Sequence, residues 1–336
     1  MAISLPVKYR PTVFEDVTEQ ESIITILKNQ IKNNGVKNCM LFAGMSGSGK
    51  TTCARIFANT LGAQIIEIDA ASNSGVDNVR NIIVESQERS LSSKYKVYII
   101  DECHQLSNAA WNAMLKLIEE PPMYTIFIFC TTDPQKVPLT ISNRVQRFNF
   151  KKISSKGIFN RLVQICNMEN FTYEEDALDY ISKIANGSMR EALSLLGQLS
   201  DYSTCINMLN IKTTLGSYTY ESFFDLANAI LDGDEKTVIS QFNNYENNGN
   251  DLKLFVDQYF EFTLNLVKYS LFKDTSIINL PNIYANELDY LTNFEAPEKY
   301  YNYIVDRLLN LKNMIKNDSN IKTTILAVLL QVTRCQ

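Results

Sequence analysis

The sequence has 336 residues, of which 45% are hydrophobic and 21% charged, the balance of a globular protein rather than of a disordered chain. That length predicts two or three domains and is enough to bury a sizeable core. The formal net charge is −5 and no part of the chain is strongly basic, which excludes a simple duplex-binding domain. Any contact with nucleic acid must come from a local patch or from several subunits acting together.

The number and spacing of the histidine and cysteine residues exclude further kinds of site. His104 is the only histidine, which excludes a His-rich zinc site and disfavours a Ser-His-Asp or Cys-His hydrolase. The seven cysteines include no CxxC pair, so we expect a reducing compartment and neither a disulfide framework nor a zinc ribbon. The N-terminus has no apolar signal-peptide core, and no apolar run approaches the ~20 residues of a membrane span. We therefore expect a soluble, cytoplasmic protein with no membrane partner.

The first 150 residues alternate short apolar runs with amphipathic segments. The apolar runs predict strands at 38–43, 65–69, 95–101, 124–130 and 145–150. Spacing near 3.6 residues predicts helices at 50–61, 76–88 and 107–120, the last beginning at a Ser107 cap and ending at Pro121-Pro122. This alternation indicates an α/β domain whose parallel five-stranded sheet is covered on both faces.

Beyond residue 150 the strand pattern fades. Residues 151–206 predict a small helical unit whose clearest helices are 174–185 and 189–199. Residues 207–336 have helical periodicity throughout, with Asp251 as the cap of a long helix through Phe272 and Pro297 near the start of another. We therefore predict an α/β domain at 1–150, a helical lid at 151–206 and a larger all-α domain at 207–336.

Residues 44–51, GMSGSGKT, match the phosphate-binding pattern G-x-x-x-x-G-K-[ST] between a predicted strand and a predicted helix. Glycines let successive N–H groups point at phosphate oxygens beside the positive end of a helix. Lys50 would reach the β- and γ-phosphates, and the Thr51 hydroxyl would bind Mg²⁺. We expect nucleotide contacts from Gly44, Ser46, Gly47, Ser48, Gly49, Lys50, Thr51 and Thr52.

Residues 97–102, VYIIDE, form an apolar run that ends in two carboxylates. In a nucleotide hydrolase the first of them, here Asp101, holds Mg²⁺, and the second, Glu102, polarises the attacking water. Many strands end in acidic residues, so this pair indicates a nucleotide hydrolase only because a phosphate loop precedes it in the sequence. His104 follows in the same DECH run, and we interpret it as a structural side chain beside the site rather than as a catalytic one.

With these motifs and several others in the family's order, the chain resembles the clamp-loader ATPases of the AAA+ class, and most closely the gamma/tau subunits of bacterial DNA polymerase III. The resemblance covers residues 8 to about 200, whereas 207–336 carry it only by length and helical character, as an all-α collar for oligomerisation. Besides the phosphate loop, the segments that carry it are KYRP (8–11), EIDAAS (67–72), KVYIIDE (96–102), LKLIEEPP (115–122), TTDPQKVP (131–138) and GSMREAL (187–193).

The resemblance implies roles for further residues. Arg10 and Pro11, with Val17 nearby, fall where the family packs the adenine base. Thr132 falls at the polar sensor near the γ-phosphate, and Arg190 at the lid arginine that reaches back to the nucleotide of the same subunit. Together with Lys50, Thr51, Asp101 and Glu102, these residues predict a working ATPase that uses ATP and Mg²⁺.

Arg144 falls at the arginine that family members insert, in trans, into the neighbouring subunit's ATP site. The family usually shows Ser-Arg-Cys there, whereas this chain reads Asn143-Arg144-Val145. The charge is retained but its flanks differ, so Arg147 stays an alternative.

The resemblance also implies partners. They are other clamp-loader subunits in a homo- or hetero-oligomer, expected to be pentameric, a sliding clamp and primer–template DNA, which the family contacts near the helix start at Ser72–Gly75. The family is classed with the DNA polymerase III holoenzyme, yet no polymerase chemistry is expected here. The sequence departs from most gamma/tau subunits because Leu61–Gln64 connects helix to strand without the four-cysteine module. We therefore expect no zinc, and a minimal subunit without the tau extension.

Two other functions compete with an ATP-driven loader. A nucleotide-binding assembly subunit without turnover would be a non-enzymatic alternative, but such subunits usually lose the phosphate-loop lysine or the strand-end acids, which this chain keeps. A DExH-type helicase is suggested by Asp101-Glu102-Cys103-His104. A helicase needs a second α/β motor domain, however, and residues 207–336 show no strand alternation that would supply one.

Overall fold

A computed structural model describes residues 3–90, 93–215, 220–247, 251–316, 318 and 320–334. The chain divides into two compact units. One joins Met1–Ile165 with Ala185–Gly197, and the other joins Cys166–Ile184 with Gln198–Gln336. The domain boundaries predicted at residues 150 and 206 stay predictions, because the compact units divide the lid segment between them.

The first unit is built on a five-stranded parallel sheet, as the sequence predicts, in the order β2-β3-β4-β1-β5. Every residue of β1 and β4 is buried, which is the pattern of central strands covered on both faces. The prediction of an α/β sheet domain is confirmed. The strands are β1 (Cys39–Ala43), β2 (Gln64–Asp69), β3 (Lys96–Asp101), β4 (Thr125–Thr131) and β5 (Gln146–Asn149).

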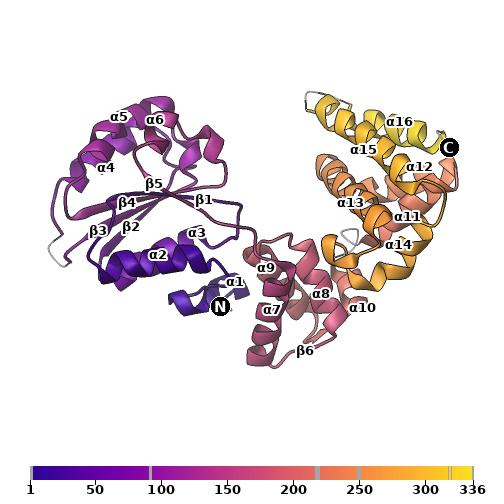
Figure 1. Ribbon diagram of the computed structural model, residues 1–336, viewed down its shortest axis with the longest axis horizontal. Coiled ribbons are helices and arrows are strands. Elements are labelled where there is room, and N and C mark those ends of the chain that lie inside the picture. Colours follow the sequence, from indigo (N-terminus) through magenta and orange to yellow (C-terminus); the bar gives the residue numbers. More distant parts are fainter. Residues whose placement is uncertain are drawn as a thin grey trace. The chain divides into compact units, whose positions relative to one another are not determined.

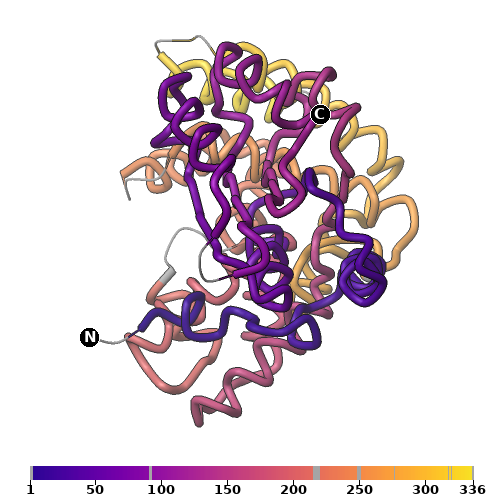
Figure 2. Tube along the Cα trace, turned by 90° about the vertical axis from the view of Figure 1, so that its left-hand side faces the viewer, coloured from indigo at the N-terminus to yellow at the C-terminus, as the bar shows by residue number. Residues whose placement is uncertain are grey.

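Helices cover both faces of this sheet. Figure 1 shows α2 (Glu21–Lys32) and α3 (Lys50–Thr60) on one face and α4 (Val76–Ser86), α5 (Asn108–Glu119) and α6 (Leu139–Ser142) on the other. In Figure 2, turned by 90°, α2 is seen along its axis. Each layer has its own apolar cluster: side chains of α2 and α3 pack with one face of the strands, and side chains of α4 and α5 with the other.

Short elements and caps fix the ends of these helices. The Ser107 hydroxyl accepts a hydrogen bond from the amide of Ala110 at 3.2 Å, so the predicted cap of α5 is confirmed. The helix ends at Glu119, before the two prolines. The same part of the chain also has a short α1 (Leu5–Lys8) and the 3₁₀ turns η1 (Phe14–Asp16), η2 (Cys103–Gln105) and η3 (Pro134–Lys136).

One buried amide side chain ties distant segments of the first unit together. Gln20, 7% exposed, has left-handed backbone torsion (φ 64°) just before α2. Its Nε2 donates to the carbonyl of Lys151 at 2.7 Å, and its Oε1 accepts from the amide of the same residue at 3.1 Å. This pair of hydrogen bonds fastens the chain before α2 to the segment that leaves β5.

The lid segment is formed by α7 (Ser155–Glu169), α8 (Glu175–Ile184) and α9 (Met189–Tyr202), close to the helices predicted. Two strands of two residues each, β6 (Thr172–Tyr173) and β7 (Cys205–Ile206), pair in parallel. Sequence analysis missed both strands, because two residues are too few to show alternation.

The C-terminal part of the second unit is helical in its described residues, and the predicted all-α collar is confirmed. Asp251 caps α13 by accepting from the amides of Lys253 and Leu254 at 2.7 and 3.2 Å, and Pro297 is the first residue of α15. The helices are α10 (Met208–Leu215), α11 (Tyr220–Leu231), α12 (Glu235–Asn247), α13 (Leu252–Phe272), α14 (Ala285–Leu291), α15 (Pro297–Met314) and α16 (Ile321–Arg334), with 3₁₀ turns η5 (Thr275–Ile277) and η6 (Asn282–Tyr284).

The described residues include no helix long and apolar enough to cross a membrane. Six cysteines lie in the described part of the chain, all of them free thiols, and only Cys205 among these is exposed. Cys335 lies outside the described residues. Nowhere among the described positions do three His, Cys, Asp or Glu side chains gather as a metal site would require.

Candidate active site

A pocket opens at the carboxyl edge of the sheet, where parallel α/β folds bind ligands. All of its lining residues belong to the first unit. It brings together most of the residues that sequence analysis assigned to nucleotide. Those predicted residues are Arg10, Pro11, Val17, Ser46, Gly47, Ser48, Gly49, Lys50, Thr51, Thr52, Asp101, Glu102 and Arg190.

The phosphate loop joins the end of β1 to the start of α3, and two of its glycines are needed for close approach. A Cβ on Gly44 would lie 2.6 Å from the carbonyl oxygen of Phe150. Gly47 has φ +73°, and a Cβ there would lie 2.1 Å from the Ser188 hydroxyl. The carbonyl of Gly47 also accepts from the amide of Met189 at 3.2 Å. Glycine therefore lets the loop curl and lets the start of α9 lie directly against it.

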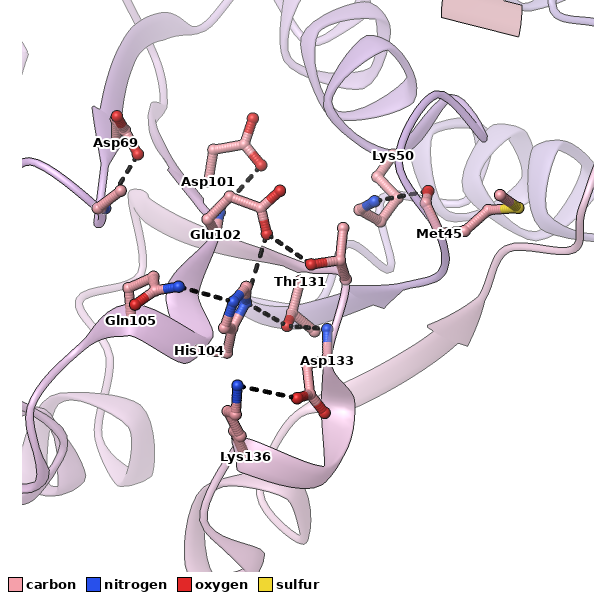
Figure 3. Close-up of polar contacts among 12 residues, drawn as sticks. Met45, Lys50, Asp69, Asp101, Glu102, His104, Gln105, Thr131, Asp133 and Lys136 are labelled. Atoms are coloured by element: carbon pink, nitrogen blue, oxygen red, sulfur yellow. Dashed lines mark hydrogen bonds and ion pairs between the residues drawn. The ribbon is translucent and has the colours of Figure 1, made fainter. Parts of the chain in front are cut away.

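Lys50 is the buried cation of the pocket, with only 5% of its surface exposed. Its Nζ donates to the carbonyl of Gly44 at 2.8 Å and to that of Met45 at 2.9 Å, and Figure 3 shows the contact with Met45. Burial lowers the pKa of this ammonium, whereas Cys130, Glu102 and Asp101 act in the opposite direction. A buried ammonium folded back on its own loop fits an anionic ligand such as a nucleotide phosphate, which would compensate its charge better than two carbonyl dipoles do.

Thr51 and Asp101 meet across the mouth of the pocket. The Thr51 hydroxyl donates to Asp101 Oδ2 at 2.8 Å, which joins the first turn of α3 to the end of β3. A hydroxyl and a carboxylate are the hard oxygen ligands that Mg²⁺ prefers beside substrate phosphates. The donor set therefore fits the predicted metal.

Glu102 follows Asp101 in a left-handed conformation, φ 47°, which is uncommon for a residue with a side chain. Its amide donates to Asp101 Oδ1 at 3.0 Å. Its Oε2 accepts from the Thr132 hydroxyl at 3.0 Å. The same oxygen lies 3.3 Å from Nδ1 of His104, a contact that Figure 3 shows. The structure thus joins the predicted sensor at the end of β4 to the predicted hydrolytic glutamate.

Positive charge surrounds the rest of the pocket. Arg10 comes from the segment after α1 and Arg190 from the start of α9. Burial, and next the like charges of Arg55 and Arg190, lower the pKa of Arg10. Sequence analysis missed Arg161 of α7, which also lines the pocket, because a single arginine on an amphipathic helix resembles a solvated charge. This concentration of guanidinium groups favours a ligand with several negative charges.

Three predicted residues lie outside the pocket lining. Gly44 lies close to the backbone of Phe150, the Thr132 hydroxyl donates to Glu102, and Arg144 pairs with Glu119 of α5. Arg147 donates to Asn149 Oδ1 at 2.7 Å, two residues further along the same strand, β5. Among the described residues, neither arginine lines the chain's own pocket.

The helix start at residues 72–75 is held locally. The Ser72 hydroxyl donates to Asp69 Oδ2 at 3.1 Å, and the Asn73 amide donates to the Asp69 carbonyl at 3.1 Å. These contacts describe a turn at the end of β2 and leave its role toward DNA a prediction.

The sheet order, the phosphate loop and the acids that follow β3 define the fold as that of an AAA+ P-loop ATPase. The RuvB Holliday junction branch migration motor of Thermotoga maritima shares this fold, with a TM-score of 0.54 and 20% identity over 66% of this chain and 79% of that one. Family models match "DNA polymerase III, delta subunit" at residues 62–154, "DNA polymerase III clamp loader subunit, ATPase lid domain" at 157–202, and "DNA polymerase III subunits gamma and tau domain III" at 206–296.

Comparison with individual relatives identifies the family more narrowly. The chain is 35% identical to the DNA polymerase III subunit gamma of Buchnera aphidicola subsp. Schizaphis graminum, over 70% of this chain and 72% of the relative. It is 33% identical to the subunit gamma/tau of Mycoplasma genitalium, over 89% of this chain and 53% of the relative. The chain belongs to the family of DNA polymerase III gamma/tau subunits. It spans roughly half the length of several curated relatives that it matches.

Proposed function

We propose that the chain is an ATP-hydrolysing motor subunit of a clamp loader, one that couples ATP binding and hydrolysis to placing a sliding clamp on primed DNA. The observation that carries the proposal is the convergence, in one pocket, of the buried ammonium of Lys50, the Thr51–Asp101 pair and Glu102. Family membership supports it, because the matched lid model is described as that of a clamp-loader subunit.

Each group in the pocket has a proposed task. The loop amides, Lys50 and Arg190 bind the β- and γ-phosphates, and Arg10, Pro11 and Val17 hold the adenine end. Thr51 and Asp101 would hold Mg²⁺, which supplies charge compensation for the phosphates. Glu102 accepts a proton from the attacking water, and Thr132 orients that carboxylate.

The proposed assembly is an oligomer of clamp-loader subunits, pentameric and cytoplasmic, that binds the sliding clamp and primer–template DNA. Its three parts are the α/β motor at 1–150, the lid at 151–206 and the collar at 207–336. Arg144 would complete the site of an adjacent subunit. Backbone N–H groups near Ser72–Gly75 would contact the template, summed over subunits since one neutral turn binds weakly.

The alternatives have less support. In the described residues beyond the first unit we find helices and the β6–β7 pair but no second α/β motor domain, which a DExH-type helicase would need. An assembly subunit without turnover would not need Glu102 and Thr132 joined by a hydrogen bond beside a complete phosphate loop.

The test is the ATPase rate of the reconstituted loader, measured with and without primed DNA and the cognate clamp. A motor subunit is expected to hydrolyse ATP slowly alone and faster when both are present. ATP binding without turnover under all conditions would instead support the non-hydrolysing alternative. Unwinding of duplex DNA by this chain alone would support the helicase.

A further inference from the structure

We propose that His104 is a positioning residue for Glu102: together with Thr132 it anchors one carboxylate oxygen and leaves the other to accept a proton from water. This inference rests on the proposed ATPase function, in which Glu102 is the general base. It gives a specific task to His104, which sequence analysis interprets as a structural side chain beside the site.

The contacts of Glu102 are one-sided. Oε2 accepts from the Thr132 hydroxyl at 3.0 Å and lies 3.3 Å from His104 Nδ1. Within the part of the chain that the structure describes, Oε1 makes no hydrogen bond. A carboxylate has acceptor capacity on both oxygens, so anchoring through Oε2 fixes the direction in which Oε1 is presented.

The surroundings of His104 define which ring nitrogen donates. Its side chain is 9% exposed, and Nε2 lies 3.1 Å from the amide nitrogen of Gln105 (Figure 3). The Glu102 carboxylate beside Nδ1 only accepts, which favours a proton on Nδ1, and Nε2 can then accept from the Gln105 amide. Nδ1 makes a hydrogen bond of 3.1 Å with the Thr131 hydroxyl and lies 3.3 Å from Glu102 Oε2, close enough for an electrostatic contact with that carboxylate oxygen.

Thr131 in turn keeps the ring in place. Its hydroxyl accepts from the amide of Asp133 at 3.0 Å, and the residue is fully buried at the end of β4. His104 belongs to η2, and its ring is therefore held against the end of β4, close to the side chain of Glu102. A flexible glutamate needs such lateral contacts, because small displacements of a reacting group can lower a rate by about 100-fold.

The kinetic test compares two replacements of His104 in the reconstituted loader with clamp and primed DNA. His104→Leu removes the donor at similar volume, and we expect kcat to fall by about 10- to 100-fold with unchanged nucleotide affinity. His104→Asn places an amide N–H near the position of Nδ1 and should restore most of the rate. Lys136→Ala is the matched control: its side chain is 63% exposed, pairs with Asp133 nearby and should leave turnover unchanged.

A double-mutant cycle shows whether His104 acts through Glu102. On the Glu102→Gln background, where hydrolysis has lost its base, His104→Leu should cause no further loss. Equal losses on both backgrounds, or a His104→Asn variant as slow as His104→Leu, would overturn the proposal.

A second measurement needs neither turnover nor a folded His104 variant. Because the sequence holds a single histidine, nitrogen NMR of the untagged, nucleotide-free chain reports one imidazole. We expect the proton on Nδ1, and a shift of that nitrogen signal when Glu102→Gln is introduced. A proton on Nε2, or a signal indifferent to Glu102→Gln, contradicts the proposal. A wild-type loader that binds ATP but never hydrolyses it contradicts the proposed function instead, whatever the NMR signal shows.

Discussion

Arg144 is held by Glu119 of its own chain: its Nε donates to Glu119 Oε1 at 2.7 Å, and its Nη1 donates to the carbonyl of Thr140 at 2.7 Å. Both side chains of the ion pair are roughly half exposed, so the pair contributes little to stability. It does restrict a flexible guanidinium to one direction. An arginine oriented in this way, and absent from its own chain's pocket, suits a role at a neighbouring site.

We therefore predict that hydrolysis requires a neighbour's Arg144. Arg144→Ala should leave ATP affinity nearly intact and remove most stimulated turnover, since arginine fingers contribute roughly 10³–10⁵ in rate to related hydrolases. Mixing Lys50→Ala with Arg144→Ala subunits should restore part of the activity, because the first can donate its arginine to the second. ATPase assays of the mixed assembly check this, and Arg147→Ala is assayed beside Arg144→Ala because Arg147 is the alternative finger. No recovery despite co-assembly, seen by light scattering, would move the role to Arg147 or to another subunit.

Nucleotide binding and ATP hydrolysis should depend on two different residues, Lys50 and Glu102. Lys50→Ala should abolish nucleotide binding, because the phosphates lose the buried cation of the loop. Glu102→Gln should keep binding and lose hydrolysis, since an amide fits the Thr132 contact but does not accept the proton. Calorimetric titration with ATP and single-turnover hydrolysis measure the two properties. Equal loss of binding in both variants would contradict this division.

The Thr51–Asp101 pair predicts a metal-dependent phenotype. Thr51→Val keeps the shape of the side chain but removes the hydroxyl, so the Mg²⁺ concentration needed for half-maximal turnover should rise. Affinity for ATP without metal should change little, since Lys50 and the loop amides are intact. A Mg²⁺ titration of the ATPase rate checks the prediction, with Thr60→Val, at the other end of α3 and outside the pocket lining, as the control. An identical Mg²⁺ requirement in Thr51→Val and wild type would exclude Thr51 as a ligand.

Gly47→Ala should disturb the contact between the phosphate loop and the start of α9. The added Cβ would lie 2.1 Å from the Ser188 hydroxyl, at a φ of +73° that alanine rarely adopts. We expect a loss of about 1–3 kcal/mol in stability together with weaker ATP binding, measured by denaturant unfolding and titration. Gly35→Ala, where no atom lies within 4 Å of the added Cβ, is the control. Combining Gly47→Ala with Ser188→Gly should relieve the clash but not the backbone strain.

The purified protein should contain no stoichiometric zinc. The chain passes from α3 to β2 through Leu61–Ala63, with no room for an inserted module. A chelator should therefore leave the nucleotide-free protein folded. Elemental analysis that finds one zinc per chain would contradict this expectation.

Much of the α/β fold was predictable because its signals are local. Buried strand segments such as 97–100 are continuous apolar runs, and Ser107 and Asp251 are caps whose hydrogen bonds need only the next few residues. The strand order was not predictable in this way. Pairing β1 between β4 and β5 depends on contacts far apart in sequence, which periodicity does not report.

The residues of the candidate site likewise divide into those that local sequence motifs predict and those that only the fold brings together. The loop and the acids of β3 form contiguous motifs, so Lys50, Thr51 and Asp101 could be found from the sequence, and the structure brings them together. Arg161 and the links among Glu102, His104 and Thr132 could not, because they join α7, η2 and β4 only after folding. A single histidine or arginine has no pattern of its own.

The amide of Gln20 constrains which mutations the chain tolerates. It donates one hydrogen bond to the backbone of Lys151 and accepts another from it. Glutamate at this position would lose the donor, lysine would lose the acceptor, and leucine would lose both. Asparagine keeps both groups on a shorter arm. In a library of single substitutions selected for growth, position 20 should therefore accept almost nothing, as a glycine in the phosphate loop would, although Gln20 belongs to no sequence motif. The fold therefore depends partly on residues such as Gln20, which a search for sequence motifs does not identify.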